Sequence, residues 1–111
     1  MTGNEYQALA MRTRNMKLFL NDSLCNGVMG LCGEAGECVD MVKKYFYQSH
    51  ELDVEHFMKE LGDVMWYVAL CCEALGRKLD DVMQGNIDKL RARYPEGFDS
   101  ERSQHREVGD V

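Results

Sequence analysis

Residues 60–72, ELGDVMWYVALCC, decide the fold class of this chain. From Val64 to Cys72 the sequence is apolar without interruption, over a length well short of the roughly 20 residues that a membrane span needs. A segment that is apolar on every side is usually a helix buried all round. We predict one helix over residues 54–75, with Asp53 as its N-cap and Gly76 as its C-terminal glycine.

The other segments are also helical in pattern, and none has the pattern of a strand. Apolar residues recur at helical spacing, β-branched residues do not alternate with polar ones, and the chain contains one proline, Pro95. The predicted fold class is therefore all-α. Further helices are expected over residues 5–20, over residues 26–48, and from Leu79 or Asp80 to the Tyr94–Pro95 step.

Two polar segments interrupt or follow these helices. Residues 21–23 should form a polar, non-helical segment before the second helix, and residues 99–111 should be frayed or disordered. This predicts one domain over residues 1–98 and a polar tail over residues 99–111. In the last helix the apolar side chains expected to face inward are Val82, Met83, Ile87 and Leu90.

Four glycines weaken the first half of the second helix: Gly27, Gly30, Gly33 and Gly36. Each costs about 1 kcal/mol relative to alanine in a helix interior. Either a neighbouring backbone or a ligand comes close to them, or a broken helix or loop precedes Glu34. The sequence leaves both interpretations open.

Composition excludes several classes of partner. The net charge of -6 and the lack of a clustered basic surface disfavour nucleic acid, and no segment is apolar for long enough to span a membrane. The first residues lack a secretory signal, which indicates the cytoplasm.

The five cysteines lack C-x-x-C spacing and are interpreted as core thiols. A chain of 111 residues buries little core alone, so a partner subunit is expected.

Two acidic pairs are the candidate functional site. Glu34 and Glu37 are three positions apart, as are Glu60 and Asp63, so each pair projects from one side of a helix. Helical steps from both pairs lead to mostly apolar stripes, which places the carboxylates at the head of core faces. Burying ionised carboxylates costs several kcal/mol each unless cations or protons neutralise them. Oxygen ligands without histidine or thiolate indicate Mg²⁺, with Mn²⁺ as a substitute.

The two pairs lie within a known pattern. Residues 30–37, GLCGEAGE, followed after 22 residues by ELGDVMWY at 60–67, resemble the E-x-x-E and E-x-x-D signature of MazG-like nucleotide pyrophosphohydrolases. Residues 86–98, NIDKLRARYPEGF, resemble the segment that closes the small members of that family.

The resemblance implies a bundle of four to five helices completed by oligomerisation, as a homodimer or homotetramer. It also implies that Glu34, Glu37, Glu60 and Asp63 are the metal ligands and catalytic residues. The implied reaction is Mg²⁺-dependent hydrolysis of a (deoxy)nucleoside triphosphate to the monophosphate and pyrophosphate, in nucleotide-pool control or house-cleaning.

The substrate phosphates need cationic or hydrogen-bonding partners. The candidates that we favour for binding them are Lys44, Asn86, Lys89 and Arg93. Trp66 and Tyr67 offer stacking surfaces for the base, although Trp66 is interpreted more readily as a core residue. The candidate polar contacts are Tyr6, Gln7 and Asn26.

Three alternatives stay open at this point. One is a dimeric dUTPase or phosphoribosyl-ATP pyrophosphohydrolase relative, and another is a non-catalytic nucleotide-binding helical protein. The third is a helical adaptor whose acidic pairs are merely solvated.

Overall fold

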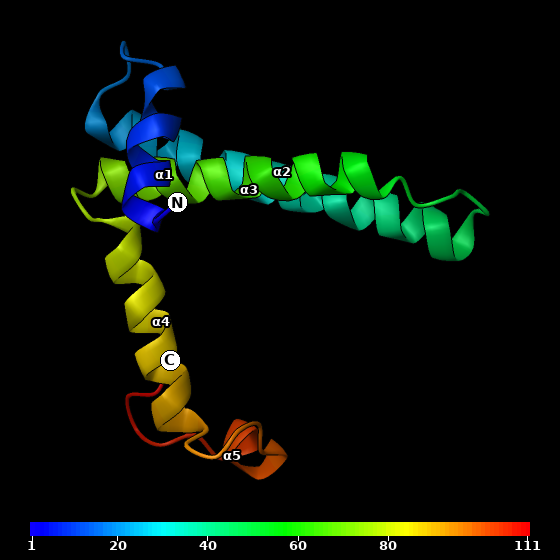
Figure 1. Cartoon of the computed structure of the whole chain (residues 1–111), viewed down its shortest axis with the longest axis vertical. Coiled ribbons are helices and arrows are strands. Elements are labelled where there is room, and N and C mark those ends of the chain that lie inside the picture. The colour runs from blue at the N-terminus through cyan, green and yellow to red at the C-terminus, as the bar shows by residue number, and fades with distance from the viewer. The chain divides into compact units, whose positions relative to one another are not determined.

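The computed structural model describes the whole chain, Met1 to Val111, and contains no strand (Figure 1). This confirms the all-α prediction. The chain divides into two compact units, Met1–Leu79 and Asp80–Val111. The helices, with one 3-10 turn named η1, are α1 Gly3–Ala10, η1 Met11–Thr13, α2 Leu20–Tyr47, α3 Val54–Ala74, α4 Leu79–Arg93 and α5 Ser100–Gln104.

The first unit is built on a hairpin of its two longest helices, α2 and α3, which lie side by side in Figure 1. The signals at the ends of α3 act as predicted. The side chain of Asp53 accepts a hydrogen bond from the backbone N–H of His56 at 3.0 Å. Gly76 follows the helix with a φ of +64°, which glycine adopts without steric cost. The helix therefore begins and ends within one residue of the predicted range.

The glycines of α2 lie in one continuous helix, so the alternative of a break before Glu34 is wrong. A Cβ on Gly30 would lie 2.1 Å from the Tyr67 ring, and one on Gly27 would lie 2.7 Å from the Cys71 sulfur. These two glycines allow α3 to approach closely. Gly33 and Gly36 meet nothing within 4 Å. Close approach of a neighbouring helix therefore explains only the first two positions.

The N-terminal helix is shorter than predicted. We expected it over residues 5–20, but α1 ends at Ala10 and η1 ends at Thr13. The Thr13 hydroxyl donates to the carbonyl of Ala10 at 2.9 Å, and the Asn15 side chain accepts from the backbone N–H of Lys17 at 3.0 Å. Such local bonds compete with helix propagation. The prediction of a non-helical segment at residues 21–23 is also wrong, because these residues belong to the first turn of α2.

A small core joins α1 to α3. Ala10, Met11, Ala69 and Leu70 are buried together, and the aromatic side chains that pack against them are Tyr6, Trp66 and Tyr67. The indole N–H of Trp66 lies 3.0 Å from both the Ala10 carbonyl and the Thr13 hydroxyl. Trp66 is therefore a core residue, as predicted.

Gln7 is a buried polar residue of α1, only 3% exposed, whose side chain makes three hydrogen bonds to other parts of the first unit. Its amide nitrogen donates to the Glu73 carboxylate at 2.9 Å and to the Arg77 carbonyl at 3.0 Å. Its amide oxygen accepts from the backbone N–H of Leu79 at 2.7 Å. The candidate role of Gln7 as a substrate contact is therefore wrong, because both ends of its amide are used inside the fold.

The second unit contains α4, α5 and the end of the chain. Asp99 caps α5 by accepting from the backbone N–H groups of Glu101 and Arg102 at 2.9 and 3.3 Å. Arg93 binds Asp110 through two hydrogen bonds of 2.7 and 2.6 Å. The prediction of a frayed tail is therefore wrong, because these side-chain bonds order it. The second unit by itself does not bury the four apolar residues that were predicted to face inward, which are all exposed: Val82, Met83, Ile87 and Leu90.

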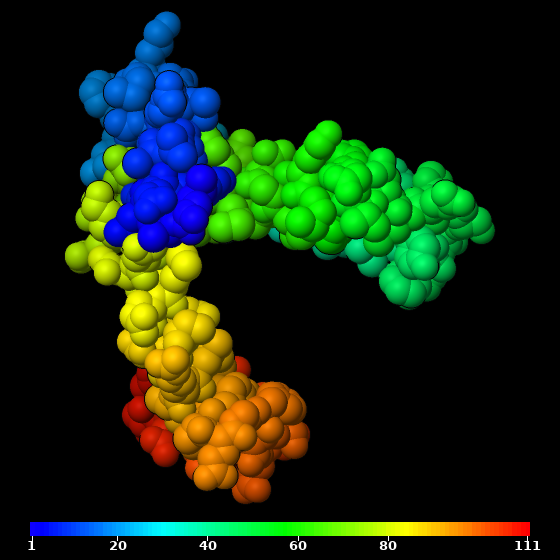
Figure 2. Space-filling view, viewed as in Figure 1, coloured from blue at the N-terminus to red at the C-terminus, as the bar shows by residue number.

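Much apolar surface of the first unit remains uncovered. On α3 the exposed apolar residues follow helical spacing and form a stripe, here called the α3 stripe: Val54, Met58, Leu61 and Met65, between 41% and 60% exposed. In Figure 2 the green part of the hairpin is open to view, while α1 lies against its other end. No helix in the chain is both long and apolar enough to cross a membrane.

The five cysteines are free thiols in different environments. Cys72 is buried, Cys38 and Cys71 are half-buried, and Cys25 and Cys32 are exposed. Burial raises the pKa of the Cys71 and Cys72 thiols above the usual value. The interpretation as core thiols is right for Cys72 and wrong for Cys25 and Cys32.

Candidate metal centre

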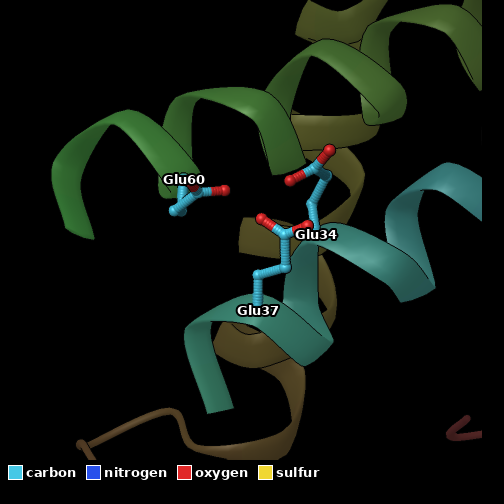
Figure 3. Close-up of side chains that lie close together, drawn as sticks. All are labelled: Glu34, Glu37 and Glu60. Atoms are coloured by element: carbon cyan, nitrogen blue, oxygen red, sulfur yellow. The ribbon is translucent and has the colours of Figure 1, made fainter. Parts of the chain in front are cut away.

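Three of the predicted carboxylates lie together between the two long helices (Figure 3). Glu34 and Glu37 come from α2, and Glu60 comes from the facing turn of α3. Each offers one oxygen, and the three oxygens lie within 4.8 Å of one another. The i, i+3 spacing on α2 and the close pairing of α2 with α3 produce this arrangement.

Glu60 is the innermost member of the cluster, at 9% exposed. Its Oε1 lies 2.8 Å from the ring nitrogen Nε2 of His56. With all three glutamates ionised, its Oε2 is buried and has no hydrogen-bond donor. A buried oxygen of this kind loses its hydration without receiving a replacement, which is unfavourable unless a cation or a proton supplies one.

The acid–base behaviour of the cluster follows from this crowding. The pKa of Glu37 is raised, chiefly because its protonated form hydrogen-bonds to Glu60. Burial raises the pKa of Glu34, and a hydrogen bond to Glu60 and the neighbouring charges add to the effect. The pKa of Glu60 is lowered, chiefly by the hydrogen bond that Glu37 donates. Without a cation, the three carboxylates therefore share protons, and Glu60 holds its charge longest.

The donor set fits a hard divalent cation. All the ligand atoms are carboxylate oxygens, and these suit Mg²⁺ and Mn²⁺ better than softer metals. A cation would neutralise charges that otherwise require protons, and it would give Oε2 of Glu60 the partner that it lacks. Glu34, Glu37 and Glu60 are the residues that would hold it.

Asp63 lies outside the three-oxygen cluster and is exposed on α3. Its charge nevertheless helps to raise the pKa values of Glu34 and Glu37. In both shifts, other causes are larger than the charge of Asp63. It also contributes, after burial, to the raised pKa of Tyr6. Asp63 therefore acts by charge both on the cluster and on Tyr6 of α1.

Lys44 lies on α2 beyond the cluster. Its ammonium group is 2.8 Å from the Asp40 carboxylate, one turn earlier. This ion pair lowers the pKa of Asp40. The structure does not bring Lys44 into the carboxylate cluster.

The other predicted phosphate contacts belong to the second unit. Asn86 and Lys89 are exposed on α4. Arg93, four residues after Lys89, is largely buried by its bidentate pair with Asp110. Arg93 therefore already has a carboxylate partner, which the sequence did not indicate.

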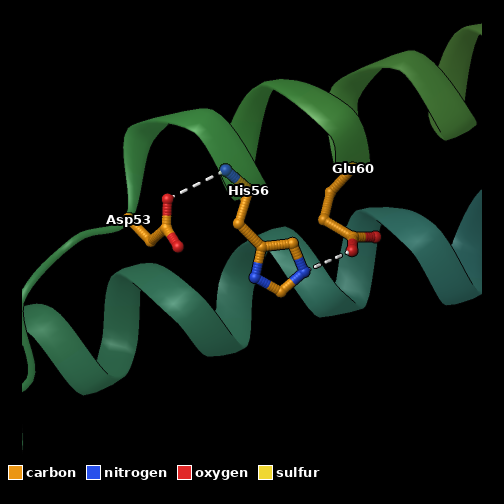
Figure 4. A network of polar contacts seen from close by, with 3 residues as sticks. All are labelled: Asp53, His56 and Glu60. Atoms are coloured by element: carbon orange, nitrogen blue, oxygen red, sulfur yellow. Dashed lines mark hydrogen bonds and ion pairs between the residues drawn. The ribbon is translucent and has the colours of Figure 1, made fainter.

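His56 is a member of the site that the sequence prediction missed (Figure 4). It stands one helical turn before Glu60, and its ring contacts that carboxylate. Its charged form also acts to lower the pKa of both Glu37 and Glu60. The signal was available in the H-x-x-x-E spacing of residues 56–60, which places the two side chains on one helix face.

The fold and the cluster define the class of this protein: an all-helical protein with three carboxylates gathered between its two long helices. The model of the MazG nucleotide pyrophosphohydrolase domain matches residues 26–98, which is more than half of the chain. The chain therefore belongs to the MazG nucleotide pyrophosphohydrolase family, which confirms the resemblance drawn from the E-x-x-E and E-x-x-D motifs.

Among curated proteins, the chain is similar to the Gene 37 protein of Mycobacterium phage L5. The two are 41% identical over an alignment of 73 residues, and the match covers 62% of this chain and 64% of that protein. The aligned part thus spans just under two thirds of the relative. No solved structure matches the chain.

Proposed function

We propose that this chain hydrolyses a (deoxy)nucleoside triphosphate to the monophosphate and pyrophosphate, with Mg²⁺ held by Glu34, Glu37, Glu60 and Asp63. The family supports the reaction class. Two observations support the metal: the oxygens of three carboxylates lie within 4.8 Å of one another, and Glu60, one of the three residues, has a buried oxygen without a donor. When bound, the metal supplies positive charge that neutralises the phosphate oxygens during hydrolysis.

The four carboxylates have different places in this proposal. Glu34, Glu37 and Glu60 supply the oxygens that already lie together. Asp63 follows Glu60 by one helical turn and acts by charge on both glutamates of α2, which supports it as the fourth ligand. Mn²⁺ is the expected substitute, because it accepts the same oxygen donors.

In this proposal, the outer phosphate oxygens of the substrate are bound by four side chains: Lys44, Asn86, Lys89 and Arg93. Lys44 and Arg93 each hold a carboxylate in the free protein, so a phosphate group would replace Asp40 and Asp110 as their partners. Arginine binds carboxylate and phosphate with the same planar pair of N–H groups, which supports this exchange for Arg93.

A second copy of the chain is part of the proposal. The exposed α3 stripe and the small size of the buried core support a homodimer or homotetramer. The place of action that we propose is the cytoplasm, where nucleoside triphosphates are made and used.

The test is incubation of the purified chain with Mg²⁺ and a panel of canonical, damaged and non-standard nucleoside triphosphates. We expect pyrophosphate and the monophosphate in equal amounts from at least one of them. Release of orthophosphate, or no turnover of any nucleotide, would contradict the proposal.

Glu60→Gln tests the assigned metal role. The substitution removes a ligand charge, so the loss of Mg²⁺ affinity should exceed the roughly 10- to 100-fold that removing an outer-shell group causes. Turnover should disappear, while circular dichroism shows unchanged helical content. Without metal, the melting temperature should not fall, because the new amide N–H can donate to the neighbouring carboxylates. Glu51→Gln, at an exposed loop position, is the control.

A further inference from the structure

His56 and Glu60 form a contact that the proposed metal centre alone does not explain. The two side chains are four residues apart on α3, and Nε2 of His56 lies 2.8 Å from Oε1 of Glu60 (Figure 4). The first turn of α3 is fixed at this point, because the backbone N–H of His56 donates to the capping side chain of Asp53 at 3.0 Å. His56 is thus held at a defined place relative to the cluster.

The two oxygens of Glu60 have different environments. Oε1 is next to the imidazole, whereas Oε2 is buried without a donor. A carboxylate that is bonded through one oxygen cannot turn freely, so the imidazole fixes which oxygen remains for another partner. The side chain of Glu60 is 12% exposed and that of His56 is 55% exposed, so the contact joins a largely buried carboxylate to an exposed imidazole.

We propose that His56 is a positioning residue for the cation at Glu60: it holds Oε1 and leaves Oε2 as the oxygen for the metal. This inference rests on the proposed metal centre. Ligating carboxylates are commonly oriented by an outer-shell hydrogen bond, and removing such a bond typically weakens metal binding by about 10- to 100-fold. The role requires only an Nε2–H donor, which the imidazolium and the Nε2–H tautomer of the neutral imidazole both provide.

The competing interpretation is an ordinary i, i+4 surface pair. Such a pair contributes little to stability and has no reason to change the affinity of a metal. The two interpretations therefore differ in metal binding, not in melting temperature.

The experiment measures Mn²⁺ binding by electron paramagnetic resonance, at one pH and without nucleotide, for the whole chain and three variants. His56→Ala should weaken Mn²⁺ binding by about 10- to 100-fold. His56→Gln keeps an amide donor at the same helical spacing and should restore most of the affinity. His50→Ala, which removes an exposed histidine outside α3, should bind like the original chain.

The outcomes separate this inference from the proposed function. If the original chain binds Mn²⁺ and His56→Ala binds it equally well, the positioning role is overturned and the metal centre stands. Equal losses in His56→Ala and His56→Gln would also overturn it, because a donor would then not be what matters. If the original chain binds no Mn²⁺, both proposals fail. Melting curves in EDTA show whether each variant folds.

Discussion

Proton sharing within the carboxylate cluster makes a prediction about pH. A raised glutamate pKa means that folding favours the protonated form. The resulting stability is fully present below the ordinary value of 4.5 and is lost as the pH rises through the raised pKa. Glu34 and Glu37 both shift in this direction, whereas Glu60 shifts in the opposite one. In EDTA, the melting temperature should therefore increase when the pH is lowered from about 7 to about 5.

Mg²⁺ and a single substitution check this explanation. The metal should raise the melting temperature at pH 7 more than at pH 5, because protons and metal compete for the same oxygens. Glu37→Gln should reduce the pH dependence in EDTA, since it removes one of the raised groups. A melting temperature that is independent of pH in the original chain would contradict the assigned proton sharing.

The candidate carboxylates could be predicted from the sequence because helical spacing determines which side chains lie on the same face of a helix. Glu34 with Glu37, and Glu60 with Asp63, each had to project from one side of a helix. What could not be predicted was the relative position of the two helices. That position excludes Asp63 from the three-oxygen cluster and places His56 beside it.

The close packing of α2 on α3 gives a matched pair of glycine variants. Gly30→Ala would place a Cβ 2.1 Å from the Tyr67 ring, so the helices must separate or the ring must move. We expect a loss of about 1–3 kcal/mol in the free energy of unfolding. Gly33→Ala meets open space and should instead gain up to about 1 kcal/mol from helix propensity.

Urea denaturation of both variants checks this prediction. Similar effects of the two substitutions would show that Gly30 is not a contact point between the helices. Because Gly33 precedes Glu34 directly, the measurement is made in EDTA to keep metal binding out of the comparison.

The C-terminal segment gives a second prediction at the level of elements. Asp110→Asn removes the charge that pairs with Arg93 in two hydrogen bonds. Amide hydrogen exchange over residues 106–111 should become faster, while exchange in α2 and α3 stays the same. Asp110 has a lowered pKa, chiefly through its hydrogen bonds with Arg93. The pair therefore stabilises the tail above the ordinary value of 3.8, and acid below that value should release it.

Asp99→Asn is the control for this substitution, because asparagine can still cap α5. Its exchange over residues 106–111 should match that of the original chain. Unchanged exchange in Asp110→Asn would show that other contacts hold the tail.

The elements differ in how far local sequence determines them. The ends of α3 were predictable because Asp53 and Gly76 act within their own turns. The end of α1 was not, because the apolar stripe continues past the point where Thr13 and Asn15 bond to the nearby backbone. The reason for Gly27 and Gly30 in α2 could not be predicted locally, because the side chains that they face, Cys71 and Tyr67, lie on another helix.

At the scale of the whole molecule, the α3 stripe predicts self-association. No large side chain in the chain is fully buried, so the hairpin has little core of its own. Multi-angle light scattering should give a mass of two or four chains. Met58→Glu places a charge in the middle of the stripe and should shift the mass toward one chain. Lys59→Glu, on the adjacent exposed position, should leave the assembly intact.

If the unsubstituted chain is monomeric at micromolar concentration, the predicted self-association is wrong. A Met58→Glu variant with unchanged mass would instead move the interface away from the α3 stripe. The interface would then lie on other exposed apolar residues of the hairpin, such as Val39 and Phe46 on α2.

The position of the carboxylates on both arms of the hairpin has a thermodynamic consequence. A cation held by Glu34, Glu37 and Glu60 cross-links α2 to α3, so its binding free energy adds to that of helix pairing. By linkage, an ion at 100 times its dissociation constant stabilises the folded state by about 2.7 kcal/mol. For a hairpin with so small a core, the surrounding ion concentration would then set the fraction of folded chains as well as the rate of reaction.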